Sequence, residues 1–276
     1  MAFEDTVLIV VGDSFVYGHY GDDMYYETCW QRSWVSKLGK LGKFKEVINL
    51  GEPGGSNKRS LRVIIEYITK NYDQTQKYFV LFGVTDISRT EFPVDNDIST
   101  TQPWLRSKVC NPLENINDSY KILSLGVWHK DNNTFNSDYY EKFYNDQYEI
   151  DMLNYNLLLL YTFFKNYNID ILFFMTVGDP KNIKKPIMGV TLPRIIFHYK
   201  KNNYFMKYTR ENIDHNVEHA PVRLQENFRI NEDIMTSFVI NHGHNVNWCG
   251  HFDHDGNEFL ANYIYYEYVK GASNGL

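Results

Sequence analysis

Three short segments combine glycine with small polar side chains directly after an apolar run. They are Gly12-Asp13-Ser14, Gly54-Gly55-Ser56-Asn57 and Gly83-Val84-Thr85-Asp86. A serine hydroxyl in such a segment can act as a nucleophile when a neighbouring base takes its proton. Histidine suits that role near neutral pH, and the C-terminal part of the sequence holds several histidines. These residue types predict acyl-transfer chemistry. The alternative interpretation is that the glycines and serines only terminate strands.

The histidines near the C-terminus also offer a second chemistry. The cluster consists of His242, His244, His251 and His254, with Asp253 and Asp255 nearby. Its H-x-H and H-x-x-H spacings suit Zn²⁺, which binds imidazole and carboxylate groups. However, the residues lie in one predicted loop, and no helical H-E-x-x-H motif is present. We therefore expect no metal and no cofactor, and a histidine-rich metallohydrolase stays as an alternative.

Two other kinds of chemistry are less favoured by the sequence. The three cysteines are odd in number and irregularly spaced, which argues against a disulfide framework and favours a reducing compartment. Cys249, between Trp248 and Gly250, is interpreted as a packed, inert thiol rather than a nucleophile. The glycines after the first strand do not form the G-x-G-x-x-G pattern of a dinucleotide site.

Asp13 is directly adjacent to Ser14 in sequence, so we expect it to be a structural hydrogen-bonding residue rather than the base.

The elements that must position these residues follow from apolar patterning. Continuous β-branched and aromatic runs, typical of strands buried on both faces, lie at 6–11, 46–50, 78–82 and 170–177. Helical periodicity is found at about 28–41, 56–70, 137–166 and 256–269. The alternation predicts an α/β fold, a three-layer α/β/α sandwich with a parallel, flavodoxin-like sheet. Ligands of such sheets bind beyond the carboxyl ends of the strands, where the three glycine-containing segments are expected.

Two segments do not fit the alternation. We expect a single domain over 1–276, with insertions at about 93–136 and 179–245. The first is rich in Pro, Asn, Asp and Ser and is interpreted as irregular. The second is long for a connection, which indicates a functional or interaction-forming role. Aromatic side chains in both could stack on sugars, although aromatics more often pack in cores and interfaces.

Composition limits the class of protein. Hydrophobic residues make up 43% and charged residues 22%, which is typical of a globular protein. The net charge of −6 and the pI of about 5.8 argue against nucleic acid and anionic membranes as partners. The N-terminus MAFEDTVLIVVGDS does not resemble a signal peptide, and no apolar run is long enough to span a bilayer. A cytoplasmic location is therefore expected.

Four motifs together resemble the blocks of the SGNH, or GDSL-type, hydrolases. VVGDSFVYG is similar to the first block, NLGEPGGSN to the second, FGVTD to the third and HFDHDGNEFLA to the last. The resemblance covers roughly 1–92, 137–178 and 246–270. It implies an SGNH hydrolase-like fold and hydrolysis of a carboxylic ester, with a small ester or an O-acetyl group on a carbohydrate as substrate.

The resemblance also implies roles for individual residues. Ser14 matches the nucleophile, and His251 matches the histidine that acts as general base and acid. The backbone N–H groups of Ser14 and Gly54 and the side chain of Thr85 match the oxyanion hole. No metal or organic cofactor is required by that mechanism.

The sequence departs from the family pattern at two positions. Thr85 stands where the family has an asparagine that donates to the oxyanion. Trp248 stands three residues before His251, where the family has an aspartate that orients the imidazole. Asn247 and Asp253 are candidates for that orienting role, and a Ser–His pair without an acid is another reading. These departures leave open a non-catalytic structural or binding protein built on a hydrolase scaffold.

Several segments in the first half of the sequence are similar to those of SGNH-type proteins encoded by tailed bacteriophages. The segments that carry this likeness are GDSFVYG, CWQRSWVSKLG and NLGEPGGSN, with the third block ending in TDISRTE. The likeness implies a phage-encoded esterase that acts on host surface glycan, with a virion-associated location. Its partners would then include virion proteins, or further copies of the chain that associate through the insertions.

Overall fold

A parallel sheet of four strands forms the centre of the molecule. The computed structural model describes residues 3–19, 26–95, 105–106, 113, 120–125, 138–183, 187–197, 235–246 and 251–270. The sheet has the strand order β2-β1-β3-β7. Its strands are β1 (Thr6–Val11), β2 (Glu46–Asn49), β3 (Lys77–Val84) and β7 (Asp170–Met175). All four lie at the predicted apolar runs, so the strand predictions are confirmed.

Strand β1 lies between β2 and β3, and the direction of chain progression reverses there. Val10 pairs with Asn49 of β2 on one side and with Leu81 of β3 on the other, both in parallel register. All six residues of β1 are buried, as its continuous apolar sequence predicts. The reversal makes the carboxyl ends of β1 and β3 the expected place for a ligand crevice.

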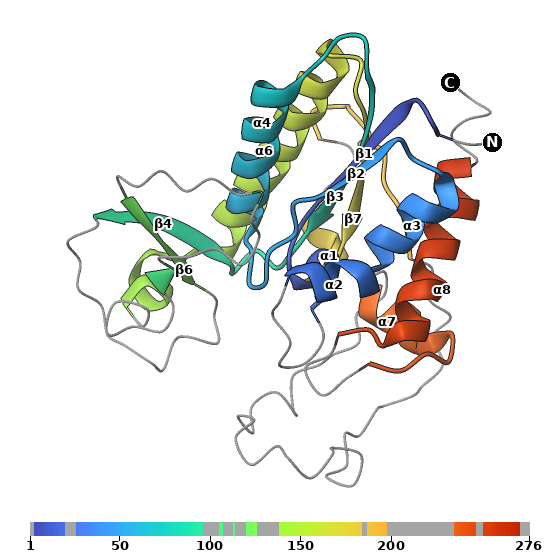
Figure 1. Cartoon of the computed structure of the whole chain (residues 1–276). Helices are drawn as coiled ribbons and strands as arrows, with labels where there is room; N and C mark the ends of the chain where they lie inside the picture. The colour runs from blue at the N-terminus through green and yellow to red at the C-terminus, as the bar shows by residue number, and fades with distance from the viewer. Residues whose placement is uncertain are drawn as a thin grey trace, which may run out of the picture.

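Helices cover both faces of this sheet (Figure 1). Helices α4 (Asn57–Asn71) and α6 (Asp146–Asn166) lie on one face, and α3 (Trp34–Gly42) and α8 (His254–Ile264) on the other. Because successive strand residues point to opposite faces, β1 contributes to two cores. Ile9 belongs to the core under α4 and α6, and Leu8 to the core under α3 and α8. The predicted three-layer α/β/α fold is confirmed.

Polar side chains decide where the helices begin, and two predicted helices are divided by them. Ser33 accepts a hydrogen bond from Ser36 N and caps α3, so the predicted helix over 28–41 is split into α2 (Tyr26–Arg32) and α3. Asn145 caps α6 in the same way. The part of the predicted helix 137–166 before this cap is a separate π-helical turn (Tyr139–Phe143).

The first insertion contains regular structure that the sequence did not indicate. Strands β4 (Thr90–Asp95), β5 (Leu105–Arg106) and β6 (Tyr120–Leu125) form an antiparallel sheet in the order β4-β6-β5. The interpretation of this segment as irregular is therefore wrong for these residues. Its proline content was misleading because Pro93 lies on β4, an edge strand, where a missing N–H is tolerated.

The second insertion returns to the main sheet. Phe173 N donates to Pro193 O, and Ile195 N donates to Phe173 O, so residues 193–195 extend the edge at β7. Helix α7 (Met235–Asn241) then packs on α8. Among the described residues, none of the helices is long and apolar enough to cross a membrane. The division into one domain with insertions at 93–136 and 179–245 stays a prediction.

Candidate active site

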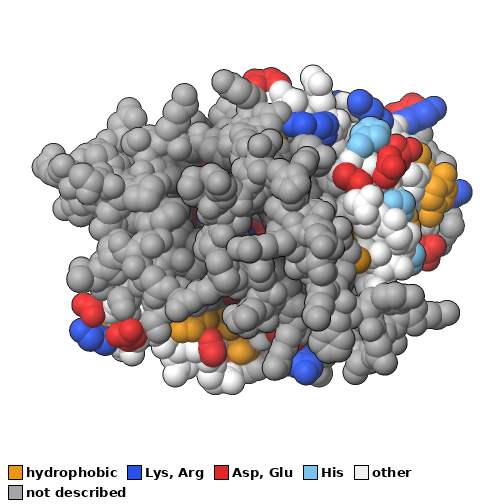
Figure 2. All heavy atoms as spheres, turned by 90° about the horizontal axis from the view of Figure 1, so that it is seen from below, with side chains coloured by type: hydrophobic (Ala, Val, Ile, Leu, Met, Phe, Trp, Pro, Cys, Tyr) orange, Lys and Arg blue, Asp and Glu red, His pale blue; other side chains and the backbone are white. Residues whose placement is uncertain are grey.

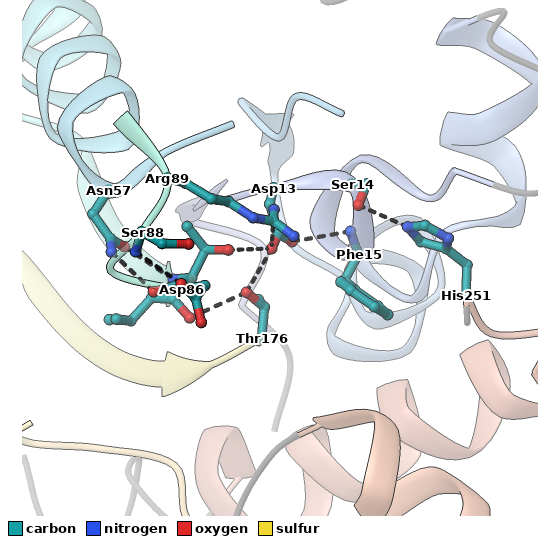
Figure 3. A network of polar contacts seen from close by, with 11 residues as sticks. Asp13, Ser14, Phe15, Asn57, Asp86, Ser88, Arg89, Thr176 and His251 are labelled. Carbon is teal, nitrogen blue, oxygen red and sulfur yellow. Dashed lines mark hydrogen bonds and ion pairs between the residues drawn. The ribbon is translucent and has the colours of Figure 1, made fainter. Parts of the chain in front are cut away.

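The hydroxyl of Ser14 and the imidazole of His251 are in direct contact. Ser14 Oγ lies 2.7 Å from His251 Nε2, although 237 positions separate the two residues in the chain (Figure 3). Both side chains are largely shielded, with 7% of Ser14 and 9% of His251 exposed. A 2.7 Å contact is within the range for proton transfer from a nucleophile to a base. The structure thus brings together the predicted nucleophile and the predicted base.

Ser14 owes its place to an abrupt change from strand to helix. Strand β1 ends at Val11, and the short helix α1 (Ser14–Tyr17) begins only two residues later. Gly12 allows this turn, because a Cβ there would lie 2.6 Å from Val16 Cγ2. Asp13 caps α1, since its Oδ1 accepts a hydrogen bond from Phe15 N at 3.1 Å. Ser14 is therefore held in the first turn of a helix directly beyond the sheet.

The other carboxylate oxygen of Asp13 accepts hydrogen bonds from three side chains. Its Oδ2 accepts from Thr85 Oγ1 at 2.7 Å, from Thr176 Oγ1 at 2.8 Å and from Arg89 Nη1 at 3.1 Å (Figure 3). The side chain of Asp13 is fully buried. Thr85 follows β3 and Thr176 follows β7, so Asp13 ties the ends of these two strands to α1. This is the structural hydrogen-bonding role expected for Asp13.

Thr85 is committed to this network through its side chain. The hydroxyl has a single proton, and it donates that proton to Asp13. Its backbone is held as well, because Thr85 N donates to Asn57 Oδ1 and Asn57 Nδ2 donates to Thr85 O, both at 2.9 Å. In this arrangement the hydroxyl proton points to Asp13 and not toward a substrate. The predicted oxyanion role of the Thr85 side chain therefore gains no support from the geometry.

Two backbone amides remain as candidate oxyanion donors. Within the part of the chain that the structure describes, the N–H groups of Ser14 and Gly54 donate no hydrogen bond. Gly54 has φ of 69°, a left-handed conformation that glycine adopts without strain. An unpaired N–H at the start of a helix and one in a glycine turn are typical sources of oxyanion stabilisation.

The loop that carries Gly54 lies against the turn that carries Ser14. Glu52 N donates to Gly12 O at 3.2 Å. Gly51 is so close to α1 that a Cβ on it would lie 2.4 Å from Tyr17 N. The loop after β2 is thus packed against the helix of the candidate nucleophile, as an oxyanion hole shared between the two segments requires.

Aromatic rings fix the plane of the His251 imidazole. The Phe15 ring stacks on it with centroids 4.5 Å apart and an angle of 27° between the planes. The His19 ring meets it edge-on, at 4.7 Å and 88°. Phe15 is the residue after Ser14, so the helix of the candidate nucleophile also orients the candidate base.

Trp34 and Asn257 support both sides of the site, and sequence reasoning missed this role. Trp34 Nε1 donates to Phe15 O at 3.0 Å, inside the chain segment of Ser14. Trp34 N donates to Asn257 Oδ1 at 2.9 Å. Asn257 Nδ2 in turn donates to Phe252 O at 3.1 Å, next to His251. The available signal was a polar residue, Asn257, within the apolar pattern of the last helix.

Comparison with known proteins gives limited similarity. No family model matches the chain, and no curated protein matches it. Among solved structures, the chain is similar to a protein described as of the G-D-S-L family, from Desulfitobacterium hafniense DCB-2, with a TM-score of 0.32 and 10% sequence identity. The match covers 62% of this chain and 60% of that protein, so it spans less than two thirds of either.

The two residues proposed to orient the imidazole have different outcomes. Asp253 Oδ1 accepts a hydrogen bond from Gly256 N at 2.7 Å, so its carboxylate caps α8. Asn247 lies outside the described residues, as do Trp248 and Cys249. The orienting roles of Asn247 and Asp253 stay predictions.

Three histidines of the cluster contact an aromatic ring, a backbone carbonyl or a carboxylate where the structure describes them. Histidines lie beside acidic and basic side chains on the surface seen from below (Figure 2). His242 Nδ1 contacts Phe238 O at 2.8 Å, the His244 ring stacks on Phe259, and His254 is 3.8 Å from Glu258. Across these described residues, no group of three or more His, Cys, Asp or Glu side chains is arranged to hold a metal ion. The metallohydrolase alternative therefore gains no support from the described geometry.

Proposed function

We propose that this protein is a serine esterase in which Ser14 and His251 hydrolyse a carboxylic ester. The single observation that carries this proposal is the 2.7 Å contact between Ser14 Oγ and His251 Nε2. The position of this pair beyond the carboxyl end of β1 supports it, because parallel α/β sheets bind their ligands there.

The reaction follows from the positions of these groups. Ser14 Oγ attacks the ester carbonyl carbon while His251 Nε2 takes the hydroxyl proton. The N–H groups of Ser14 and Gly54 stabilise the resulting oxyanion. The C–O bond to the alcohol then breaks, and His251 returns the proton to the departing oxygen. A water molecule, deprotonated by His251, hydrolyses the acyl-enzyme and regenerates Ser14.

The narrower substrate is an O-acetyl group on a carbohydrate. This part rests on the motif resemblance to SGNH hydrolases, together with the aromatic side chains of the insertions. The resemblance to phage-encoded members supports a virion-associated protein that acts on host surface glycan, with virion proteins or further copies of the chain as partners.

The test is hydrolysis of p-nitrophenyl acetate by the wild type and by Ser14→Ala and His251→Ala. We expect turnover by the wild type and a loss of at least about a hundredfold in each variant. Ser60→Ala is the matched control, because Ser60 is a buried serine in α4 whose hydroxyl has no partner among the described residues. Turnover that survives in Ser14→Ala would contradict the proposal.

A second function is favoured by the hydrogen bond of Thr85 to Asp13. A site with only two oxyanion donors is weaker, since one such donor is worth on the order of a hundredfold in rate. The corresponding function is a non-catalytic binding protein on the same scaffold. A fluorophosphonate probe separates the two, because it labels a serine with an aligned base even when the natural ester is unknown. A wild type that neither labels nor turns over would contradict the esterase and favour the binding protein instead.

A further inference from the structure

We propose that Arg89 is a positioning residue for Ser14 and acts through Asp13. The inference rests on the proposed function, because it assigns a role in the reactivity of the same serine. Arg89 was not among the candidate site residues, and it does not contact Ser14 or His251 in any described hydrogen bond or ion pair.

The Asp13 carboxylate requires an opposite charge where it lies. Its side chain is 0% exposed and that of Arg89 is 11% exposed, and the two form an ion pair at 3.1 Å. A carboxylate removed from water keeps its charge only when a cation and hydrogen-bond donors replace the solvent. The two threonine hydroxyls supply donors, and Arg89 supplies the cation.

The two oxygens of this carboxylate have separate tasks. Oδ1 holds the first turn of α1 through Phe15 N, whereas Oδ2 binds Thr85, Thr176 and Arg89. A displacement of the carboxylate therefore moves the turn that contains Ser14. The 2.7 Å contact with His251 depends on that turn, and small displacements of reacting groups are costly in rate.

Arg89 is itself held in a defined place. It follows a turn in which Ser88 N donates to Asp86 Oδ1 and Arg89 N donates to Asp86 O, and β4 begins at the next residue. Arg89 also lines a cavity between α4 and α6, together with apolar residues such as Leu61 and Leu157. Lys58 and Glu149 line the same cavity and form an ion pair with each other at 3.4 Å, whereas the Arg89 guanidinium forms an ion pair with Asp13. Figure 3 shows Arg89 and Ser14 on opposite sides of Asp13.

The experiment measures how fast Ser14 reacts with a fluorophosphonate probe. The rate constant at saturating probe is separated from the probe concentration at half-saturation. The variants are Arg89→Met, which keeps the length without the charge, and Arg89→Lys, which keeps the charge. Arg62→Met is the matched control, because it removes an ion pair between Arg62 and Glu91 that does not involve Asp13.

We expect the saturating rate constant of Arg89→Met to fall by about tenfold to a hundredfold with little change in half-saturation. Arg89→Lys should recover most of the rate, and Arg62→Met should stay within about twofold of the wild type. A double-mutant cycle with Asp13→Asn adds a direct test of the coupling between Arg89 and Asp13. If Arg89 acts through Asp13, Arg89→Met should have little further effect in the Asp13→Asn background.

Each other outcome has a distinct meaning. Equal labelling of Arg89→Met and the wild type, with both folded by circular dichroism, would overturn the role of Arg89. A loss in Arg62→Met as large as that in Arg89→Met would do the same, because general destabilisation would then explain both. Additive losses in the cycle would show that Arg89 does not act through Asp13. Failure of the wild type to label would instead overturn the proposed function, and this inference with it.

Discussion

The side-chain oxygen of Asn257 accepts a hydrogen bond from the backbone N–H of Trp34 at 2.9 Å, between residues 223 positions apart in the chain. The indole N–H of Trp34 holds Phe15 O, and the side-chain N–H of Asn257 holds Phe252 O. One buried pair thus connects the helix that begins at Ser14 with the loop of His251. The relative position of these two segments depends on how α3 packs against α8.

Asn257→Ala should weaken both the fold and the site. The variant loses hydrogen bonds to three backbone groups, each worth about 0.5–1.5 kcal/mol, and leaves the Trp34 N–H buried. We expect the free energy of unfolding in urea to fall by about 2–4 kcal/mol and fluorophosphonate labelling to slow by about tenfold. Asn262→Ala is the control, because Asn262 lies on the same helix and makes only an exposed bond to Glu258 O. Labelling of Asn257→Ala at the wild-type rate would refute the link to the site.

Thr85→Val tests where the hydroxyl of Thr85 acts. The change keeps the shape of the side chain but removes one of the donors to the buried Asp13 carboxylate. We expect Thr85→Val to lower the free energy of unfolding by about 1–3 kcal/mol. Thr85→Ser keeps the hydroxyl and should retain most of the wild-type stability. If the hydroxyl served the oxyanion instead, Thr85→Val would slow p-nitrophenyl acetate hydrolysis without changing stability. Comparing urea denaturation with turnover distinguishes the two.

Gly51→Ala should disturb the site from the loop after β2. A Cβ at Gly51 would lie 2.4 Å from Tyr17 N, a backbone atom of α1 that cannot yield without moving the helix. We expect lower stability, by about 1–3 kcal/mol, together with slower labelling of Ser14. At Gly39 a Cβ would lie equally near an atom, but that atom is Val47 Cγ2, a side-chain methyl. Gly39→Ala should therefore leave labelling within about twofold.

Alkaline pH should destabilise the fold through partly buried tyrosines. Burial, together with neighbouring negative charge, raises the pKa of Tyr140 above its usual value. Burial likewise raises the pKa of Tyr263. The unfolded chain releases these protons near pH 10 while the folded chain keeps them, so stability is full below about pH 10 and falls as pH rises above it.

Denaturation in urea between pH 8 and 11 measures this effect. Tyr140→Phe should show a flatter fall above about pH 10, although its stability at pH 8 is lower because it loses the hydrogen bond to Ser88 O. Tyr155→Phe, at a tyrosine that is 50% exposed, is the control and should follow the wild type. An unchanged slope in Tyr140→Phe would show that this tyrosine does not contribute.

The central sheet could be predicted because its signals are local, whereas the pairing of Ser14 with His251 followed from the motif resemblance to SGNH hydrolases. A run such as TVLIVV is apolar on both faces, which is typical of a strand inside a covered parallel sheet. The register of the last motif, by its resemblance to the family block, pointed to His251 as the catalytic histidine. The cap of α4 is a local signal of the same kind, since Ser56 Oγ accepts a hydrogen bond from Arg59 N only three residues later.

The rest of the site depends on contacts between distant residues. The sequence around Arg89 does not indicate that its partner is Asp13, which lies 76 positions away. The sequence around Asn257 likewise does not indicate Trp34, which lies 223 positions away. The match of Thr85 to a family asparagine gave the position but not the direction of its hydroxyl. The sheet of β4, β5 and β6 was missed because antiparallel pairing across a long connection leaves little periodicity in its short strands.

The separation of Ser14 and His251 in the chain has a consequence for biosynthesis. A ribosome makes the serine and the first strands long before it makes the histidine, so a growing chain carries a hydroxyl without its base. Under the proposed function, Ser14 becomes reactive only after α8 has packed on α3, a contact between segments that are distant in sequence. Reactivity of Ser14 is therefore a marker of completed folding, and Ser14 in partly folded chains should not react with a fluorophosphonate probe.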